Sequence, residues 1–497
     1  MSVDQASRAG MLLGSEIYSP LKITWQKSVT RTDRMKNKLN SWRRVKRLPL
    51  GWSDVAVLAL ILAVGIALLK LSPLGISDRS DKYSQDLFNH YMGDLFYPDT
   101  HQQDSVVLLL TDEVVETKLQ GRWPAPYDFH GRVLNTLLLH EPDSLFIDFL
   151  WMDREKPGIK YLIKVLKKYK KKNIPVYIAA KSHESFMAAW PELQGLVIPV
   201  SAHIGFDPSD FVARQYLFSS GELETAAFSM AKRLKPELEN IDPDSRMDIF
   251  WGTRTNLFNS SWMDTENQKS SNLINEVAGG FSDFIRRPPY STTFFVRDLL
   301  NPIADTEAKA TQQLREILQE KHIFYGANLS GVQDILLSPT REILPGIYYH
   351  TMAFDNLLTW GADYKTGTPN SLLMLLLDLT VLFPVAFIGL IFHRKRDLSE
   401  SDHRLSKKRY PWPAIVNNLC ENGAKYIAKW IASLSILFSW IALCSWIEFH
   451  YFNISAASWM GYLGVISLGF ATEKLELIER FNQWWKSNIY KKEKRYD

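Results

Sequence analysis

Cysteine is almost absent from this 497-residue chain, which contains only Cys420 and Cys444. So few cysteines exclude a fold that is held together by several disulfide bonds. Residues 73–370 contain no cysteine at all, so a domain in this region must be stable through its hydrophobic core alone. About 300 residues are ample for such a core.

Motifs for several kinds of catalysis are also absent. The sequence has no Gly-rich phosphate-binding loop, no Gly-x-Ser-x-Gly nucleophile elbow and no cluster of His and Cys at metal-ligand spacing. We therefore expect a protein that is not an enzyme and that uses no cofactor or metal ion. The net charge of +4, from 58 basic and 54 acidic residues, is informative only where the charges cluster.

One cluster of basic residues lies beside a long apolar run. Residues 31–47 hold eight Lys or Arg and one acid, and residues 55–69 are apolar without a charge. A basic run binds nucleic acid, binds anionic lipid, or marks the cytoplasmic side of a membrane span. With Trp52 and Leu71 at the interfaces, the apolar run reaches the length that a bilayer requires. A buried core helix and a cleaved signal peptide fit less well, so we expect a membrane span and no nucleic-acid partner.

Three more apolar stretches follow near the other end of the chain, at 371–392, 426–447 and 456–471. The segment 393–425 carries eight Lys or Arg against four acids, whereas 448–455 carries no Lys or Arg. Counting positive charges therefore places both termini in the cytoplasm and residues 73–370 outside. A bacterial periplasm permits an external domain without disulfide bonds. We therefore expect a multi-pass protein of a bacterial inner membrane.

This topology divides the chain into eight parts. They are a basic cytoplasmic arm (1–50), the first span (52–71), an extracytoplasmic domain (73–370), the second span (371–392), a basic cytoplasmic loop (393–425), the third span (426–447), the fourth span (456–471) and an amphipathic cytoplasmic tail (472–497).

The stretch 105–153 predicts the fold of the external domain. A short apolar run ends in Asp112, residues 133–138 have helical spacing, and a second apolar run ends near Asp148. Short apolar run, helix and short apolar run are typical of a βαβ unit in a parallel sheet that is buried on both faces. We therefore expect an α/β domain with a mostly parallel sheet flanked by helices, in addition to four transmembrane helices.

Later segments continue this alternation. Residues 159–169 form an amphipathic helix with a lysine-rich face, which is either a solvated surface or a surface for lipid headgroups or an acidic partner. Further strands are expected at 174–179, 196–200, 247–251 and 322–327.

Several motifs in the external region, in this order, resemble the CHASE2 domain, an extracellular sensory module of bacterial receptors. The motifs are Thr111-Asp112-Glu113, Gly121-Arg-Trp-Pro124, Leu145-Phe-Ile-Asp-Phe149, Ile323-Phe-Tyr-Gly326, Asp334, Ser338-Pro339, Pro345-Gly-Ile347, His350, Ala353 and Asn356-Leu-Leu358. The resemblance covers about residues 78–361 and implies one span before the domain and three after it. CHASE2 receptors usually continue into a kinase or cyclase, for which residues 472–497 are too short, so we expect the output from a separate cytoplasmic protein.

Acidic residues at the predicted strand ends are the first candidates for a ligand site. Ligands in open α/β sheets bind outside the carboxyl ends of the strands, where Asp112, Glu113 and Asp148 are expected. Asp334 follows the last predicted strand and is expected to face the same crevice as Asp112. These acids either recognise a ligand, hold a divalent cation for catalysis, or cap helices and strand ends.

Four more residues are candidates for functional roles. Trp123 fixes a turn with Pro124 or lines a pocket, and His350 is either a packed histidine or a pH-sensing ligand-site residue. Asp378 in the second span either pairs with a neighbouring helix or lines a water path or packing switch, and Pro384 would bend that helix.

Two main functions agree with these features. The first is an inner-membrane receptor, expected as a homo-oligomer in the bilayer, whose external domain recognises a ligand or partner and signals to a cytoplasmic protein. The second is an oligomeric membrane effector or channel gated by the same domain, for example in a defence system. An assembly factor for an envelope complex is a third hypothesis.

Overall fold

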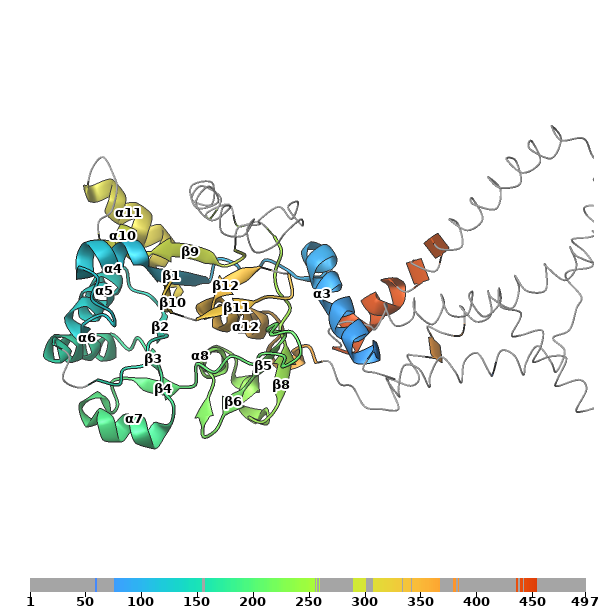
Figure 1. Ribbon diagram of the computed structural model, residues 1–497, viewed down its shortest axis with the longest axis horizontal. Coiled ribbons are helices and arrows are strands. Elements are labelled where there is room, and N and C mark those ends of the chain that lie inside the picture. Colours follow the sequence, from blue (N-terminus) through green and yellow to red (C-terminus); the bar gives the residue numbers. More distant parts are fainter. Residues whose placement is uncertain are drawn as a thin grey trace, which may run out of the picture. The chain divides into compact units, whose positions relative to one another are not determined.

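A six-stranded parallel sheet forms the centre of the domain (Figure 1). The structure is a computed structural model that describes residues 59, 76–153, 157–254, 256, 259, 289–300, 307–332, 334–340, 342–366, 379–380, 383, 435–436, 439–440 and 442–453. The strand order is β4-β3-β2-β10-β1-β9, and each neighbouring pair is parallel. The strands are β1 (Ser105–Thr111), β2 (Ser144–Ile147), β3 (Val176–Ala179), β4 (Ile198–Val200), β9 (Thr292–Phe295) and β10 (His322–Asn328).

The predicted α/β class is confirmed. The strand order, however, could not be predicted from the sequence. Strand β10 lies between β1 and β2, pairing Val107 with Phe324 on one side and Phe146 with the same Phe324 on the other. The opening βαβ unit is therefore parallel without having adjacent strands. The strand expected at 247–251 is found, but it is shorter, Arg246–Asp248, and it pairs outside the main sheet.

One face of the sheet, called here the aliphatic face, is packed mainly by Leu and Val side chains. Leu108 and Leu110 of β1 belong to the same buried cluster as Leu134 and Leu137 of α5 (Tyr127–Leu139), and all four are almost completely buried. Figure 1 shows the helices on this side of the sheet. They are α4 (Asp112–Leu119), α5 (Tyr127–Leu139), α6 (Ile159–Lys171), α10 (Val296–Leu300) and α11 (Glu307–Leu318), with α7 (His183–Ala189) and the 3₁₀ turn η2 (Pro191–Leu193) near β4.

The opposite face, called here the aromatic face, is covered by α8 (Ala226–Leu234) and α12 (Ile347–Trp360) (Figure 1). Phe146 and Phe324 of the sheet pack in the same buried cluster as Phe354 of α12. Helix α12 approaches the sheet closely at Gly326, where an added Cβ atom would lie 2.8 Å from the Cβ of Ile347. The glycine of β10 therefore allows the helix to lie directly on the sheet.

Smaller elements complete the domain. Antiparallel pairs are formed by β5 (Gln215–Leu217) with β8 (Arg246–Asp248), β6 (Ser219–Ser220) with β7 (Leu223–Glu224), and β11 (Ile335–Leu337) with β12 (Ile343–Pro345). The remaining elements are the long helix α3 (Ile76–Phe96) and the turns η3 (Pro236–Asn240) and η4 (Gly361–Asp363).

A buried arginine joins helix α3 to the domain. The Nε and Nη2 atoms of Arg214 each donate to a carboxylate oxygen of Asp86 at 2.8 Å, and Nη2 also donates to Asp210 at 2.6 Å. Arg214 is 4% exposed and Asp86 is 7% exposed. Bidentate pairing of this kind satisfies both buried charges and fixes the geometry of the helix.

The membrane prediction concerns parts of the chain that are mostly undescribed. Among the residues that the structure does describe, we find no helix with the length and apolarity needed to traverse a bilayer. The predicted spans 52–71, 371–392 and 456–471 lie wholly or almost wholly outside these residues, and 426–447 is described only in part, as helix. Asp378 and Pro384 also lie outside the described residues.

Candidate functional site

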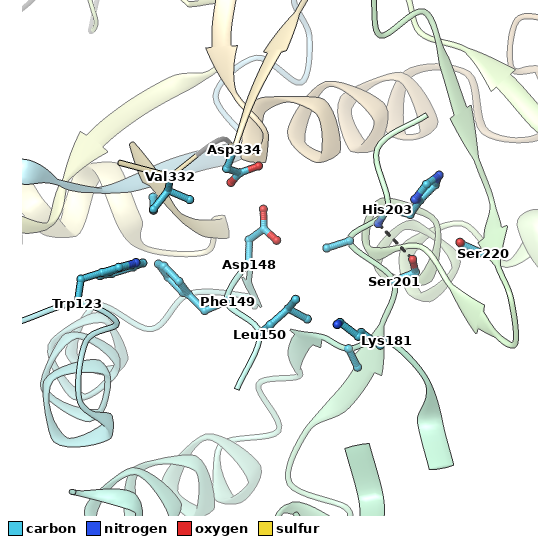
Figure 2. A pocket seen from close by; sticks show the side chains of 13 residues that line it. Trp123, Asp148, Phe149, Leu150, Lys181, Ser201, His203, Ser220, Val332 and Asp334 are labelled. Atoms are coloured by element: carbon cyan, nitrogen blue, oxygen red, sulfur yellow. Dashed lines mark hydrogen bonds between the residues drawn. The ribbon is translucent and has the colours of Figure 1, made fainter. Parts of the chain in front are cut away.

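A pocket of about 500 Å³ lies at the carboxyl edge of the central sheet (Figure 2). We call it the edge pocket. Its lining comes from the ends of β2, β3, β4, β6 and β10 and the segments that follow them, together with Trp123 from the segment between α4 and α5. Ligand sites in open parallel sheets occur at this edge, and their volumes commonly fall within about 300–1,000 Å³.

Two carboxyl groups face each other in the middle of the edge pocket. Asp148 is the residue after β2, and Asp334 lies in the loop after β10 (Figure 2). Among the described residues, no side chain forms an ion pair or hydrogen bond with either carboxyl group. Burial raises the pKa of Asp148 well above its usual value, and the neighbouring Asp334 raises it further. Burial also raises the pKa of Asp334.

The backbone explains why both acids occupy this position. The Asp148 amide donates to the carbonyl of Tyr325 at 2.8 Å, which extends the pairing of β2 with β10 by one residue. The Gly346 amide donates to the Asp334 carbonyl at 3.0 Å. A Cβ atom on Gly346 would lie 2.2 Å from Asp334 Oδ1, so only glycine at the start of α12 leaves room for this carboxyl group.

An aromatic wall borders the acids on one side. The rings of Trp123 and Phe149 lie edge to face with centroids 6.1 Å apart, and Trp123 is 36% exposed. Phe149 also packs against the ring of Tyr325 at 4.8 Å, which fixes it to the sheet. The peptide bond between Trp123 and Pro124 is cis.

A second wall, on the other side of the acids, carries hydrogen-bond donors and a cation. Lys181 follows β3, Ser201 and His203 follow β4, and Ser220 ends β6 (Figure 2). The His203 amide donates to Ser201 Oγ at 3.2 Å, which orients the short turn after β4. No acid of the described part of the chain forms an ion pair with Lys181. The edge pocket thus has an aromatic wall and a wall with a cation and donors, and the two acids lie between them.

Asp112 and Glu113 were predicted to share this site, but their side chains do not line the edge pocket. Both lie in the first turn of α4, where acids are favoured by the helix dipole. Asp112 accepts hydrogen bonds from the amide and hydroxyl groups of Ser330, and Glu113 forms a 2.5 Å ion pair with Arg297. The structure therefore groups Asp334 with Asp148 and not with Asp112.

His350 also lies away from the edge pocket, inside the aromatic face. Its side chain is fully buried, and Nδ1 lies 2.9 Å from the hydroxyl group of Tyr216. Burial lowers the pKa of His350 to about 3. The imidazole is consequently neutral at physiological pH, which contradicts the hypothesis that it senses pH in that range.

The proposed divalent-cation site of Asp112, Glu113 and Asp148 is not formed. Within the described ranges, no group of three or more His, Cys, Asp or Glu side chains is arranged to hold a metal ion.

Sequence reasoning missed a second feature, a set of packed rings around Phe449 that we call the Phe449 cluster. The Phe449 ring centroid lies 5.4 Å from Phe96 at the end of α3, 5.4 Å from Phe250 and 5.8 Å from Trp360 at the end of α12. Phe449 is 3% exposed and belongs to the helix 442–451. The only signal in the sequence was an aromatic-rich segment at the predicted external end of the third span.

Lys365 strengthens this contact. Its Nζ donates to the Phe449 carbonyl at 2.8 Å and to Asn453 Oδ1 at 3.0 Å, and it lies 4.5 Å from the centroid of the Phe449 ring. The amide of Thr366 donates to the Asn453 carbonyl at 2.9 Å. Burial lowers the pKa of Lys365 to about 8. These bonds join the segment after α12 to residues 442–453.

The family comparison agrees with the motifs described above. The model of the CHASE2 domain matches residues 56–391, more than half of the chain, so the chain belongs to the CHASE2 family. The predicted resemblance is thereby confirmed, and with it a sensor-type extracellular domain. No curated protein and no solved structure matches the chain.

Proposed function

We propose that this protein is an inner-membrane receptor in which the edge pocket receives a ligand and the Phe449 cluster passes the change to the membrane helices. The receptor acts as a homo-oligomer in the lipid bilayer, and a separate cytoplasmic protein supplies the output. The CHASE2 family supports the sensory role of the domain.

The observation that carries this proposal is the position of helix α12. Its start at Gly346 lies against the Asp334 carboxyl group, and its last residue, Trp360, belongs to the Phe449 cluster. The helix has 14 residues, which corresponds to a length of about 21 Å. A packed helix moves as a rigid unit, so a shift at the pocket also displaces the ring of Trp360.

Three segments that border predicted spans meet at the Phe449 cluster. Helix α3 follows the first predicted span, Lys365 precedes the second, and residues 442–453 connect the third to the fourth. Their contacts are those of Phe96, Lys365 and Phe449 described above. A change in the packing of this cluster would alter the relative positions of the external ends of the spans, which is how we propose that the signal crosses the membrane.

Hydrogen exchange on the full-length protein in lipid nanodiscs tests this function without a ligand. Asp334→Asn removes one pocket charge while conserving shape, and we expect a change of at least about threefold in the exchange of amides in residues 442–453. Glu113→Gln is the matched control, because it neutralises an acid outside the edge pocket. Unchanged exchange in both Asp334→Asn and Asp148→Asn would refute coupling between the pocket and the cluster.

A further inference from the structure

We propose that the edge pocket binds a small zwitterion, with the ammonium group between Asp148 and Asp334 and the anionic group against Lys181 and the donors after β4. This inference rests on the proposed function, because it names the ligand class of the same pocket. It concerns a free small molecule and not a lipid headgroup or a metal ion.

The acidic side of the edge pocket requires a cationic partner. Asp148 and Asp334 face each other, and no described side chain neutralises either of them (Figure 2). Two facing carboxylates repel each other, so in the empty pocket one of them is favoured in the protonated form. Burial raises both pKa values in agreement with this geometry. An ammonium group donates three hydrogen bonds and would remove the repulsion.

The aromatic wall favours an organic cation over a metal ion. Trp123 and Phe149 present ring surfaces beside the acids, and rings of this kind attract ammonium groups. A calcium ion needs about six to eight oxygen ligands, and the pocket offers two carboxyl groups. A volume of about 500 Å³ is also far larger than an ion requires.

The opposite wall suits an anionic group. Lys181 contributes a positive charge that no acid of the described residues pairs with, and the hydroxyl groups of Ser201 and Ser220 and the ring of His203 can donate hydrogen bonds. A carboxylate is bound well by such a combination of a charge with neutral donors. Because acids and donors lie on different sides of one pocket, a ligand that carries both charges satisfies both.

The test measures binding to the full-length protein in nanodiscs by calorimetry and by thermal shift. The probes are the twenty L-amino acids and 4-aminobutyrate, and for each one that binds, the amine without its carboxylate and the acid without its amine. Calcium chloride alone is measured in parallel. We expect at least one zwitterion to bind and each single-charge analogue to bind about tenfold or more weakly.

Variants of the pocket residues show which residues bind the ammonium group and which bind the anionic group of the ligand. Asp148→Asn and Asp334→Asn should each weaken the zwitterion about tenfold while hardly affecting the acid analogue, and Lys181→Met should weaken the zwitterion while hardly affecting the amine analogue. Glu113→Gln should bind as the wild type does. Circular dichroism checks that each variant is folded. If one of the two acid variants does not fold, the other still tests the proposal.

Three results would overturn the proposal. They are the absence of binding by every zwitterion, equal affinity for the amine analogue, and a calcium shift that depends on Asp148 while no zwitterion binds. The exchange experiment on Asp334→Asn uses no ligand. If residues 442–453 respond in that experiment and no zwitterion binds, the ligand class is wrong and the receptor function stands.

Discussion

The two faces of the central sheet are packed in different ways. The aliphatic face buries side chains such as Leu134 and Leu137 against the sheet, and such contacts have little directional preference. The aromatic face buries rings such as Phe324 and Phe354, and it contains α12 and the Phe449 cluster. One face supports the fold, whereas the other also contains the helix that, in our proposal, connects the edge pocket to the predicted membrane segments.

Buried hydrogen bonds also order the aromatic face. On the aromatic face, the Asn356 amide group donates to the Tyr97 hydroxyl and the Phe250 carbonyl at 2.9 Å, and its oxygen accepts from the Phe250 amide at 2.8 Å. The Tyr97 hydroxyl in turn donates to Asp355. Such bonds specify one arrangement, because each group left unpaired in the interior costs about 1–3 kcal/mol.

Truncation of one large side chain on each face should distinguish the face that only stabilises the fold from the face that also affects residues 442–453. These two substitutions should have the largest effects on stability. We expect Leu134→Ala to lower the unfolding free energy by about 2–5 kcal/mol and Phe354→Ala by about 3–5 kcal/mol, because both side chains are fully buried. Urea unfolding measures both losses. Only Phe354→Ala should also speed hydrogen exchange in residues 442–453 relative to the rest of the domain; equal local effects would remove the distinction between the faces.

Removal of the central ring of the Phe449 cluster should have a large but local effect. Phe449→Ala is expected to lower the opening free energy of residues 442–453 by about 3 kcal/mol, since the ring is buried among Phe96, Phe250 and Trp360. Tyr451→Ala, two residues away and 71% exposed, should change it by less than about 0.5 kcal/mol. Hydrogen exchange of the amides gives both values, and similar losses in the two variants would argue against a specific cluster.

Acid should weaken the aromatic face through His350. Its pKa is lowered to about 3 by burial, so the unfolded chain binds a proton below pH 6.5 that the folded chain does not bind. This contribution to stability is present above pH 6.5 and is lost as the pH falls towards 3. Between pH 6.5 and 5 the loss should be roughly 2 kcal/mol. Urea unfolding should give a shallower pH dependence for His350→Gln, and an unchanged one would contradict the assignment.

Neutralising the edge pocket should produce the smallest change, in the stabilising direction. The pKa of Asp148 is raised in the folded state, so the protonated carboxyl group favours the folded state at low pH. This contribution to stability is lost as the pH rises from the usual pKa of an aspartic acid through the raised pKa. Asp148→Asn should therefore be more stable than the wild type at pH 7.5, by roughly 0.5–2 kcal/mol. Thermal melts should show this difference shrinking below about pH 4, and a destabilised variant would refute the unpaired state of the carboxyl group.

Much of the sheet and part of the site were predictable because both follow from local patterns. Short apolar runs that end in Asp112 and Asp148 predict buried parallel strands, and these strands are found. Asp148, Asp334 and Trp123 were named as candidates, and all three line the edge pocket. The rule that carboxyl ends of parallel strands meet at one edge accounts for Asp148 and Asp334, although Asp334 was expected beside Asp112.

The remaining features depend on contacts between distant parts of the chain. The insertion of β10 between β1 and β2 is a matter of tertiary order that no period in the sequence encodes. Lys365 and Phe449 are 84 residues apart, and neither has a sequence signature that predicts their contact. Asp112 and Asp148 look equivalent as strand-end acids, and only the turn into α4 directs Asp112 to Ser330.

A double-mutant cycle between Asp334→Asn and Phe449→Ala tests most directly whether α12 connects the edge pocket to the Phe449 cluster. The quantity to measure is the opening free energy of the α12 amides, obtained by hydrogen exchange on the full-length protein in nanodiscs. We predict that the two effects are non-additive by about 0.5–2 kcal/mol. Additivity within about 0.3 kcal/mol would mean that the pocket and the cluster are independent, and would contradict the account.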